Sequence, residues 1–307
     1  MTRVLTVTLN PALDLTYDVP ALLVGRSVRV AAVRSRAGGK GVNVASVVRA
    51  LGGEAVVVAP GALTTPDPFR DGLDRLGLPY RLVPAFESVR QTVAVVGADG
   101  ATTILLEPGR SAVEGTPEAL EAAVADELTR ADVLVVSGSL PPGLPHDLPA
   151  RLARLADVPA IIDVSGAALR AATGAGAVLT PNADELAELV GSRPETIGEV
   201  AAHGRRLIEA GAAAVVVTLG EKGAVAITPS GAWLAHTARV VDGNPTGAGD
   251  AAAAALAIHL ADKIDWPAAL ADAVATSAAC VLKPVAGEID LQARARWRDT
   301  ITVEELT

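Results

Sequence analysis

The chain has 307 residues, half of them hydrophobic but only 2% aromatic, so Ala, Val and Leu must form most of its core. A chain of this length buries about three quarters of its unfolded surface and needs no disulfide, and its single cysteine, Cys280, can form none within the chain. Its 26 Lys and Arg against 35 Asp and Glu give a formal net charge of −9 at pH 7. That balance excludes the extended basic surface on which general nucleic-acid or membrane-surface binding depends.

The sequence also carries no signal for a metal cluster, a membrane span or export. One cysteine and four scattered histidines show no metal-ligand spacing. The longest apolar run, residues 251–261, is about half the ~20 residues that a bilayer-spanning helix needs. The N-terminus enters a strand-like segment at Val4 without the layout of a signal peptide. We therefore expect a cytoplasmic protein that binds neither nucleic acid nor membranes.

Short apolar runs alternate along the chain with Ala- and Leu-rich segments of helical length. The expected strands are residues 4–9, 55–59, 133–137, 160–164, 177–179 and 214–218. The expected helices are residues 42–51, 117–129, 148–156, 183–190, 197–210, 251–261 and 266–281. Apolar strands that alternate with helices predict an α/β fold, a Rossmann-like and mostly parallel sheet with helices on both faces.

Two extended, half-polar segments interrupt this alternation, at about residues 15–34 and 88–106. Residues 93–96 and 102–106 flank an Asp-Gly pair, which is typical of a β-hairpin. We expect both segments to form a small β-sheet inserted into a single domain over residues 1–307. A lid over a binding site is the natural use of such a sheet.

A first glycine motif, Gly38-Gly39-Lys40-Gly41, leads directly into the expected helix 42–51. A glycine turn that opens a helix exposes backbone N–H groups, and the helix dipole adds partial positive charge, so an anion is favoured there. Lys40 would add a full charge. The alternative is an ordinary tight turn with a solvated lysine. The spacing excludes a Walker A loop, and no GxGxxG dinucleotide fingerprint occurs in the chain.

A second glycine motif, Gly247-Ala248-Gly249-Asp250, opens the Ala-rich helix near the C-terminus. Asp250 could cap that helix, which contributes about 1 kcal/mol. It could instead be a general base beside an oxyanion hole formed by the amides of residues 247–249. The residues alone leave both interpretations open.

Together with further segments in the expected order, these motifs resemble the signatures of the PfkB (ribokinase-like) carbohydrate kinases, in the phosphofructokinase and tagatose-phosphate kinase branch. The further segments are residues 8–14 (TLNPALD), 137–143 (SGSLPPG), 163–166 (DVSG), 181–186 (PNADEL) and 218–224 (TLGEKGA). The resemblance extends over residues 4–290. It implies a ribokinase-like fold and a kinase that uses ATP and Mg²⁺.

The resemblance also implies a role for particular residues. Asp250 would accept the proton of the attacking sugar hydroxyl, and the amides of Gly247, Ala248 and Gly249 would stabilise charge on the transferring phosphoryl group. Lys40 and Arg90 would hold the phosphate already on the substrate. The other residues expected around the sugar are Asp14, Gly38, Gly39, Asn43 and Ser139. The residues expected along the nucleotide are Asn182, Thr218, Gly220 and Gly223, with Glu185 toward the metal. Relatives with such a lid often form a homodimer through it.

Several positions depart from the family pattern. Thr180 stands where many sugar-phosphate kinases have Lys, and Ser46 stands where Arg is usual. Residues 61–68 (GALTTPDP) replace a loop that is normally rich in glycine, and Asn244-Pro245 resembles the tagatose-6-phosphate kinase version. These departures bear mainly on the identity of the sugar.

We predict an ATP-dependent kinase that acts on a ketohexose phosphate. Fructose 1-phosphate is favoured, giving fructose 1,6-bisphosphate, with tagatose 6-phosphate and fructose 6-phosphate next. Two fixed cations, Lys40 and Arg90, would be wasteful beside a neutral sugar. The alternatives are a kinase for an unphosphorylated sugar or nucleoside, and a catalytically silent sugar-phosphate or nucleotide-binding protein, which only Thr180 and the loop at residues 64–68 support. A dehydrogenase is disfavoured because the dinucleotide fingerprint is missing.

Overall fold

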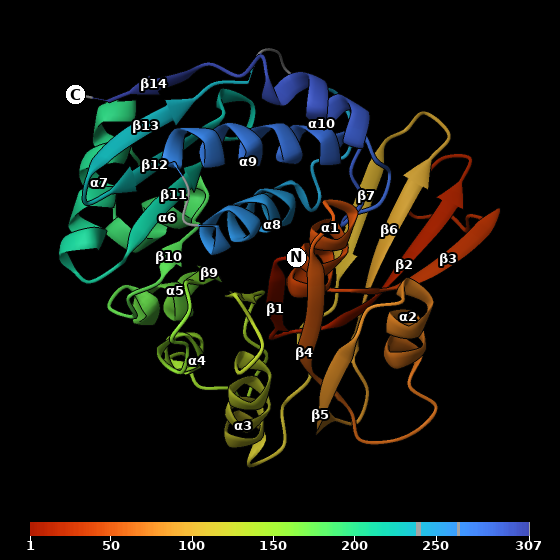
Figure 1. The fold of residues 1–307 in the computed structure, drawn as a ribbon. Coiled ribbons are helices and arrows are strands. Elements are labelled where there is room, and N and C mark those ends of the chain that lie inside the picture. Colours follow the sequence, from red (N-terminus) through yellow and green to blue (C-terminus); the bar gives the residue numbers. More distant parts are fainter. Residues whose placement is uncertain (238–240, 263–264, 307) are drawn as a thin grey trace.

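The computed structural model describes residues 1–237, 241–262 and 265–306, and in these residues it contains a ten-stranded and a four-stranded sheet (Figure 1). The larger sheet has the order β14-β13-β12-β11-β10-β9-β8-β1-β4-β5. Its strands are β1 (Arg3–Thr8), β4 (Glu54–Ala62), β5 (Tyr80–Phe86), β8 (Val133–Ser137), β9 (Ala160–Asp163), β10 (Val178–Leu179), β11 (Ala214–Thr218), β12 (Ala224–Thr228), β13 (Gly231–Ala235) and β14 (Val303–Glu305). The strands from β11 through β5 pair in parallel, whereas β12, β13 and β14 form an antiparallel edge.

Helices cover both faces of this sheet because successive side chains of a strand point to opposite faces. On β4, Val57 joins one buried cluster while Val56 and Val58 join the other. The first cluster packs under α1 (Lys40–Ala50), α2 (Pro68–Leu76), α8 (Ala248–Ala261) and α9 (Trp266–Val281). The second packs under α3 (Thr116–Leu128), α4 (Leu148–Arg154), α5 (Gly166–Ala172), α6 (Ala183–Val190) and α7 (Ile197–Glu209). The predicted α/β architecture is confirmed.

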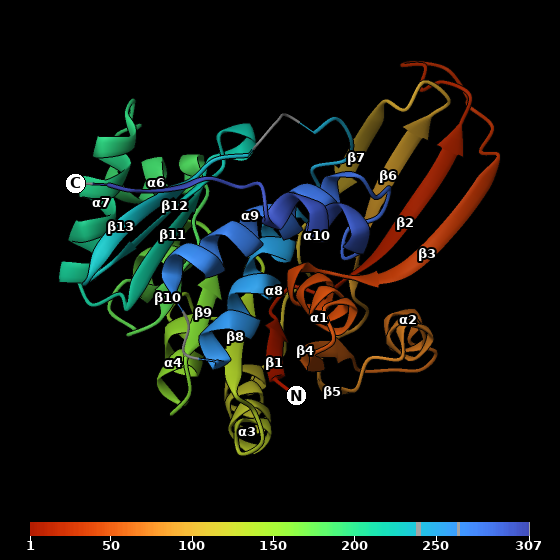
Figure 2. The same cartoon turned by 45° about the horizontal axis from the view of Figure 1, so that its top comes forward.

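The four-stranded sheet has the order β3-β2-β6-β7 and projects from one end of the larger sheet (Figures 1 and 2). Its strands are β2 (Ala12–Val19), β3 (Ala32–Gly38), β6 (Arg90–Gly97) and β7 (Thr102–Leu106). The central pair, β2 and β6, is parallel, and β6 and β7 form the predicted hairpin. The sheet therefore exists as predicted, but β2 begins before residue 15 and β3 continues beyond residue 34.

Several elements were missing from the sequence prediction. They are α2, β5, α5, the edge strands β12–β14 and the helix α10 (Leu291–Arg298). The segment 61–68, predicted as one loop, is shorter in the structure. Gly61 and Ala62 still belong to β4, and Pro68 already begins α2, whose first turn is capped by Asp67. A proline in the first helical turn is favoured because its missing N–H has no partner to lose there.

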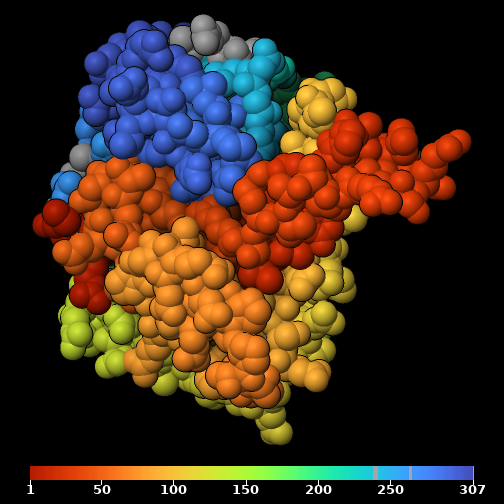
Figure 3. Space-filling view, turned by 90° about the vertical axis from the view of Figure 1, so that its right-hand side faces the viewer, coloured from red at the N-terminus to blue at the C-terminus, as the bar shows by residue number. Residues whose placement is uncertain are grey.

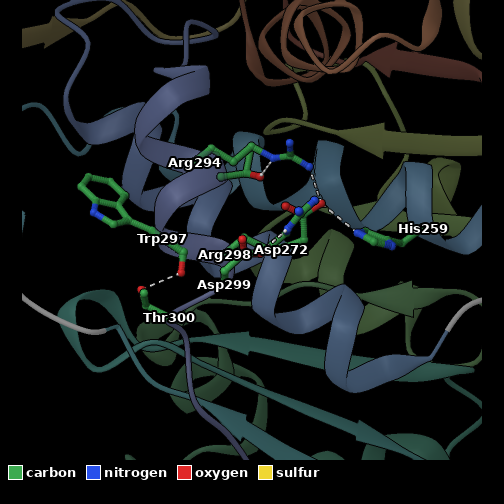
Figure 4. A network of polar contacts seen from close by, with 8 residues as sticks. His259, Asp272, Arg294, Trp297, Arg298, Asp299 and Thr300 are labelled. Atoms are coloured by element: carbon green, nitrogen blue, oxygen red, sulfur yellow. Dashed lines mark hydrogen bonds and ion pairs between the residues drawn. The ribbon is translucent and has the colours of Figure 1, made fainter.

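A buried polar network joins the C-terminal helices α8, α9 and α10 (Figure 4). Asp272 on α9 lies 2.8 Å from His259 Nε2 of α8 and accepts a 2.6 Å bond from Arg294 of α10. Burial would raise the pKa of Asp272, but the hydrogen bonds from His259 and Arg294 outweigh it and hold the pKa below its usual value. The network fixes helix α8, whose first turn carries Asp250. In the part of the chain that the structure describes, no helix is long and apolar enough to cross a membrane.

Candidate active site

The two glycine motifs, more than 200 residues apart in sequence, meet where the first turns of α1 and α8 lie together. Asn43 of α1 donates a 2.8 Å hydrogen bond from Nδ2 to Oδ2 of Asp250 on α8. Gly39 precedes α1 with φ 106° and Gly247 precedes α8 with φ 84°. Both values lie in the left-handed region that only glycine adopts freely. The sequence signal of two glycine turns thus marks one site.

Asp250 is the most strongly perturbed carboxylate of this site. Its side chain is buried, and Gly247 rather than Asp250 occupies the N-cap position of α8. The capping interpretation of Asp250 is therefore wrong, because the carboxylate is directed to Asn43 instead. Burial first, and the charge of Asp163 second, raise the pKa of Asp250 to about 7, against the opposing effects of Lys40 and Asn43. A base with a pKa near neutrality suits proton abstraction at physiological pH.

The glycines before Asp250 differ in what surrounds them. A Cβ on Gly247 would lie 2.8 Å from Cβ of Ala286, so no larger residue fits there. A Cβ on Gly249 would meet nothing within 4 Å, and Gly249 lines the cavities described below. The N–H of Ala248 already donates to Pro245 O at 3.1 Å. Of the three predicted amide donors, those of Gly247 and Gly249 have no acceptor among the described residues.

Asp14 and Arg90 come together on the four-stranded sheet. Asp14 on β2 pairs in register with Thr92 on β6, and Thr92 Oγ1 donates to Asp14 Oδ1. Burial raises the pKa of Asp14, while Thr92, Arg36 and Arg90 oppose the rise. Arg90 donates from Nη1 to Glu107 O at 3.0 Å, but its buried Nε has no partner. A buried donor without a partner is costly and points to a ligand that satisfies it.

Gly38 and Ser139 occupy the same neighbourhood. A Cβ on Gly38 would lie 1.8 Å from Oδ2 of Asp14, so the carboxylate can occupy its position only because residue 38 is glycine. Ser139 Oγ accepts a 3.0 Å bond from Nδ2 of Asn10, which holds the loop after β8 against the start of β2.

Lys40 lies among different partners. Its Nζ is 3.1 Å from Oδ1 of the buried Asp163. Burial would lower the pKa of Lys40, but the carboxylates of Asp163, Asp250 and Glu185 raise it above its ordinary value. The charges that act on Arg90 come instead from Asp14 and Glu107. The described contacts therefore do not join Lys40 and Arg90 into the predicted pair that holds one phosphate.

A small cleft of about 60 Å³ surrounds Lys40 and opens beside a larger cavity of about 640 Å³. The residues predicted for the nucleotide, Asn182, Thr218, Gly220 and Gly223, all line the larger cavity. One wall is apolar and comes from α9, with Ala273, Val274 and Val281. No sequence pattern predicts this wall, because small apolar residues on a helix carry no distinctive signal. A cavity of this size and mixed lining suits a nucleotide.

The residues around the small cleft also fit a magnesium ion held together with phosphates. Asp163 Oδ2 and Thr180 Oγ1 are buried without a partner, and Glu185 lines the same cleft. Mg²⁺ is usually held by one or two carboxylates together with substrate phosphates and water rather than by an all-protein cage. Consistent with this, no cluster of three or more His, Cys, Asp or Glu exists among the described residues. Asp163 lies in the segment 163–166 that resembles the family, but the sequence predicts no role for this residue.

Contacts with α9 and with the segment that follows it hold the turn before α8 in place. Asn244 donates to Pro284 O at 3.0 Å and accepts from the N–H of Thr246 at 3.0 Å. Cys280 is fully buried on α9, with Sγ 3.8 Å from Thr246 O. Burial raises the pKa of Cys280 to about 11. Cys280 is therefore a small buried side chain rather than a reactive thiol.

Comparison with known proteins identifies the class that this fold and site define. The model of the pfkB family carbohydrate kinases matches residues 7–293. The chain belongs to this family and is a phosphotransferase, a carbohydrate kinase with ATP as its cosubstrate.

Individual relatives narrow the comparison. Over 263 residues the chain is 32% identical to ATP-dependent 6-phosphofructokinase isozyme 2 of Mycobacterium tuberculosis, which covers 84% of this chain and 78% of the relative. It is 31% identical over 269 residues to 1-phosphofructokinase of Xanthomonas campestris, covering 85% of each. The structure of phosphofructokinase-2 from Escherichia coli in complex with potassium superposes with a TM-score of 0.91 at 28% identity, covering 98% and 99% of the two chains. A ribokinase from Thermotoga maritima, at 20% identity and TM-score 0.77, shows the shared fold, so the ribokinase-like prediction is confirmed.

Proposed function

We propose that the protein phosphorylates a ketohexose phosphate, with fructose 1-phosphate as the favoured substrate and tagatose 6-phosphate and fructose 6-phosphate next. The observation that carries the proposal is the buried Asp250–Asn43 pair, set between the Asp14–Arg90 group and the nucleotide-sized cavity. Relatives named 6-phosphofructokinase and 1-phosphofructokinase support the substrate class and leave the order of preference to experiment.

Asp250 acts as the general base in this proposal. Asn43 holds Oδ2, which leaves Oδ1 to accept the proton of the attacking sugar hydroxyl. With a pKa near 7, the carboxylate is largely ionised just above neutral pH and is still basic enough to take that proton. The fixed orientation matters because phosphoryl transfer depends mainly on positioning and electrostatic stabilisation.

Groups that can stabilise a phosphoryl group lie on the nucleotide side of Asp250. The start of α8 and the amides of Gly247 and Gly249 would face the transferring phosphoryl group. Gly249 lines the small cleft, in which Lys40 also lies. This position supports a role for Lys40 at the transferring phosphoryl group rather than at the phosphate already on the sugar. Asp163 and Glu185 would hold Mg²⁺, which when bound neutralises charge on the nucleotide phosphates.

Arg90 and Asp14 act at the sugar. The buried, unpartnered Nε of Arg90 would be satisfied by a phosphate oxygen of the substrate. Asp14, held by Thr92, would accept hydrogen bonds from sugar hydroxyls. In this proposal, Arg90 binds the phosphate already on the substrate, and Lys40 binds the phosphoryl group that is transferred.

The test is coupled ADP release with Mg²⁺ and ATP against fructose 1-phosphate, fructose 6-phosphate, tagatose 6-phosphate, free fructose and ribose. We expect turnover on the phosphates and little on the free sugars. Arg90→Gln should raise KM for the preferred phosphate by about tenfold or more, equivalent to ~1.4 kcal/mol. Its matched control, Arg81→Gln on the exposed Arg81 of β5, should not. Equal activity on free fructose would overturn the proposal and favour a sugar kinase, and binding without turnover on any substrate would favour a silent binding protein.

We further propose that the four-stranded sheet serves as a lid and forms a homodimer contact. Its outer strand β7 is exposed along its length, with Leu105 57% and Leu106 68% exposed, and Val33 on β3 is 60% exposed. Exposed apolar residues on edge strands mark an interaction surface. Light scattering should report a dimer whose dissociation is promoted by Leu106→Glu, whereas a monomeric wild-type protein would contradict the contact.

A further inference from the structure

A separate cavity of about 470 Å³ lies between β3, α1 and the segment that follows α9. It shares no lining residue with the two cavities of the active site. Figure 3 shows this face of the molecule, on which the blue segment after α9 lies against the orange-red β3 and α1. The residues that give it chemistry are Arg36, Ser46, Arg49, Lys283 and Glu288.

The lining of this cavity is mainly positive, whereas the chain as a whole is negatively charged. Three cations, Arg36, Arg49 and Lys283, face one carboxylate, Glu288, in a protein whose formal net charge is −9. The ammonium of Lys283 is 3.9 Å from its nearest carboxylate oxygen, on Asp290, which is long for a charge-assisted bond. The charges of Asp14 and Glu288 act on Arg36. Arg49 donates to the carbonyls of Leu76 and Gly77 rather than to a carboxylate. The protein itself therefore neutralises the positive charge of the cavity only in part.

We propose that this cavity binds a small phosphate-bearing anion and regulates the enzyme from outside the active site. Guanidinium groups match phosphate oxygens with paired N–H donors, and an ammonium adds a point charge. The volume admits a phosphorylated metabolite of the size of a sugar phosphate. The apolar side chains of Leu76 and Leu78 on the wall would contact its carbon skeleton.

Arg36 connects this cavity to the active site. It donates to Ala286 O and, at 3.0 Å, to Ser46 Oγ. Ala286 in turn packs on Gly247, since a Cβ on that glycine would lie 2.8 Å from Cβ of Ala286. An anion that draws the guanidinium of Arg36 away from the Ala286 carbonyl releases the support behind Gly247. The expected effect is a lower kcat, measured at saturating substrates.

The experiment uses inorganic phosphate as the probe, at constant ionic strength set with chloride. Thermal unfolding of the ligand-free protein measures binding, and coupled ADP release at saturating substrates measures kcat. The test variant is Arg49→Ala with Lys283→Ala, neither of which lies in the active site. The matched control is Arg205→Ala with Arg206→Ala, which removes the same charge from the exposed face of α7. Arg90→Gln reports on phosphate bound at the active site.

Phosphate should stabilise the wild type and lower its kcat, and the phosphate concentration needed should rise at least tenfold in the Arg49/Lys283 variant but not in either of the others. A response lost only in Arg90→Gln would place phosphate in the active site and overturn the proposal, as would an equal response in every variant. Stabilisation lost in the Arg49/Lys283 variant without any effect of phosphate on kcat would support the site and overturn its regulatory role. Because unfolding is followed without substrates, the result does not depend on the sugar specificity proposed above.

Discussion

Replacing Asp250 by Asn should inactivate the enzyme and stabilise it in the same step. As the general base, Asp250 contributes ~10²–10⁴ to the rate, and Asn cannot accept the proton. Burial raises the pKa of this carboxyl from 3.8 to about 7, which means that ionising it costs more in the native state than in the unfolded one. At 1.36 kcal/mol for each pKa unit, this difference lowers the stability of the wild type by up to about 4 kcal/mol above neutral pH. Asn has no charge to bury.

The pH dependence separates this cause from a general packing effect. Between pH 3.8 and about 7 the native state keeps the Asp250 proton while the unfolded state has lost it. The native state then binds more protons than the unfolded state, so the unfolding free energy of the wild type falls as pH rises through this window. The extra stability of Asp250→Asn should be about 1.6 kcal/mol at pH 5, grow to about 4 kcal/mol toward pH 7 and stay constant above pH 8.

Urea unfolding of both ligand-free proteins from pH 5 to pH 8, together with coupled ADP release, measures both effects. The control is Asp126→Asn, which alters an exposed ion pair with Arg81 and should change stability by less than ~1 kcal/mol at every pH. A stability difference that is independent of pH, or a variant that keeps more than a tenth of the wild-type kcat, would refute the reasoning.

The other substitutions each test one contact. Gly249→Ala places a methyl group in open space beside the phosphoryl position, so kcat should fall at least tenfold while thermal unfolding shows unchanged or slightly higher stability. Lys40→Met removes the cation that lowers the pKa of Asp250, so the acid limb of the pH profile of kcat/KM should move to higher pH. Asp272→Asn leaves Arg294 without its buried counter-charge and should cost about 3–5 kcal/mol by urea unfolding at neutral pH. Since the native pKa of Asp272 is held low, that cost should shrink only as acid protonates the wild-type carboxyl.

Each of these has a matched control. Gly198→Ala alters a helical glycine with room for a methyl group on α7, away from the cavities, and should leave kcat unchanged. Arg205→Met removes an exposed cation of the same helix and should leave the pH profile in place. Asp299→Asn removes a 72% exposed ion-pair partner and should cost little. Parallel effects in a test variant and its control would contradict the assigned contact.

Local sequence patterns predicted the buried frame of the fold well. The bounds of β8, β11, α6 and α9 agree with the prediction. Apolar strands and helix boundaries can be recognised from a short stretch of sequence. The edge strands β12 and β13 were missed because Ala and Gly, which have little strand preference, make up much of Ala224 to Thr228 and Gly231 to Ala235. Helix α2 was missed because the run of turn-forming residues before Pro68 hides its start.

Individual residues of the site were predicted from the sequence, but not which of them contact one another. The glycine motifs located Asp250 and Lys40, yet nothing local indicates that Lys40 lies 3.1 Å from Asp163, 123 residues away. The same holds for Arg36, whose guanidinium reaches the segment after α9. Such partners are set by the packing of distant elements, which a single sequence does not encode in any local pattern.

The single cysteine, Cys280, can report transient local opening of the folded protein. Cys280 is buried with its Sγ in contact with the Thr246 carbonyl. The high pKa of the thiol keeps it unreactive while this contact persists. The residues next to this contact also line the nucleotide-sized cavity: Pro245, Ala248 and Val281. The rate at which a thiol reagent labels the unmodified protein therefore counts openings of the turn that carries Gly247. A nucleotide that closes over this turn should slow the labelling, so transient opening can be followed without introducing any probe.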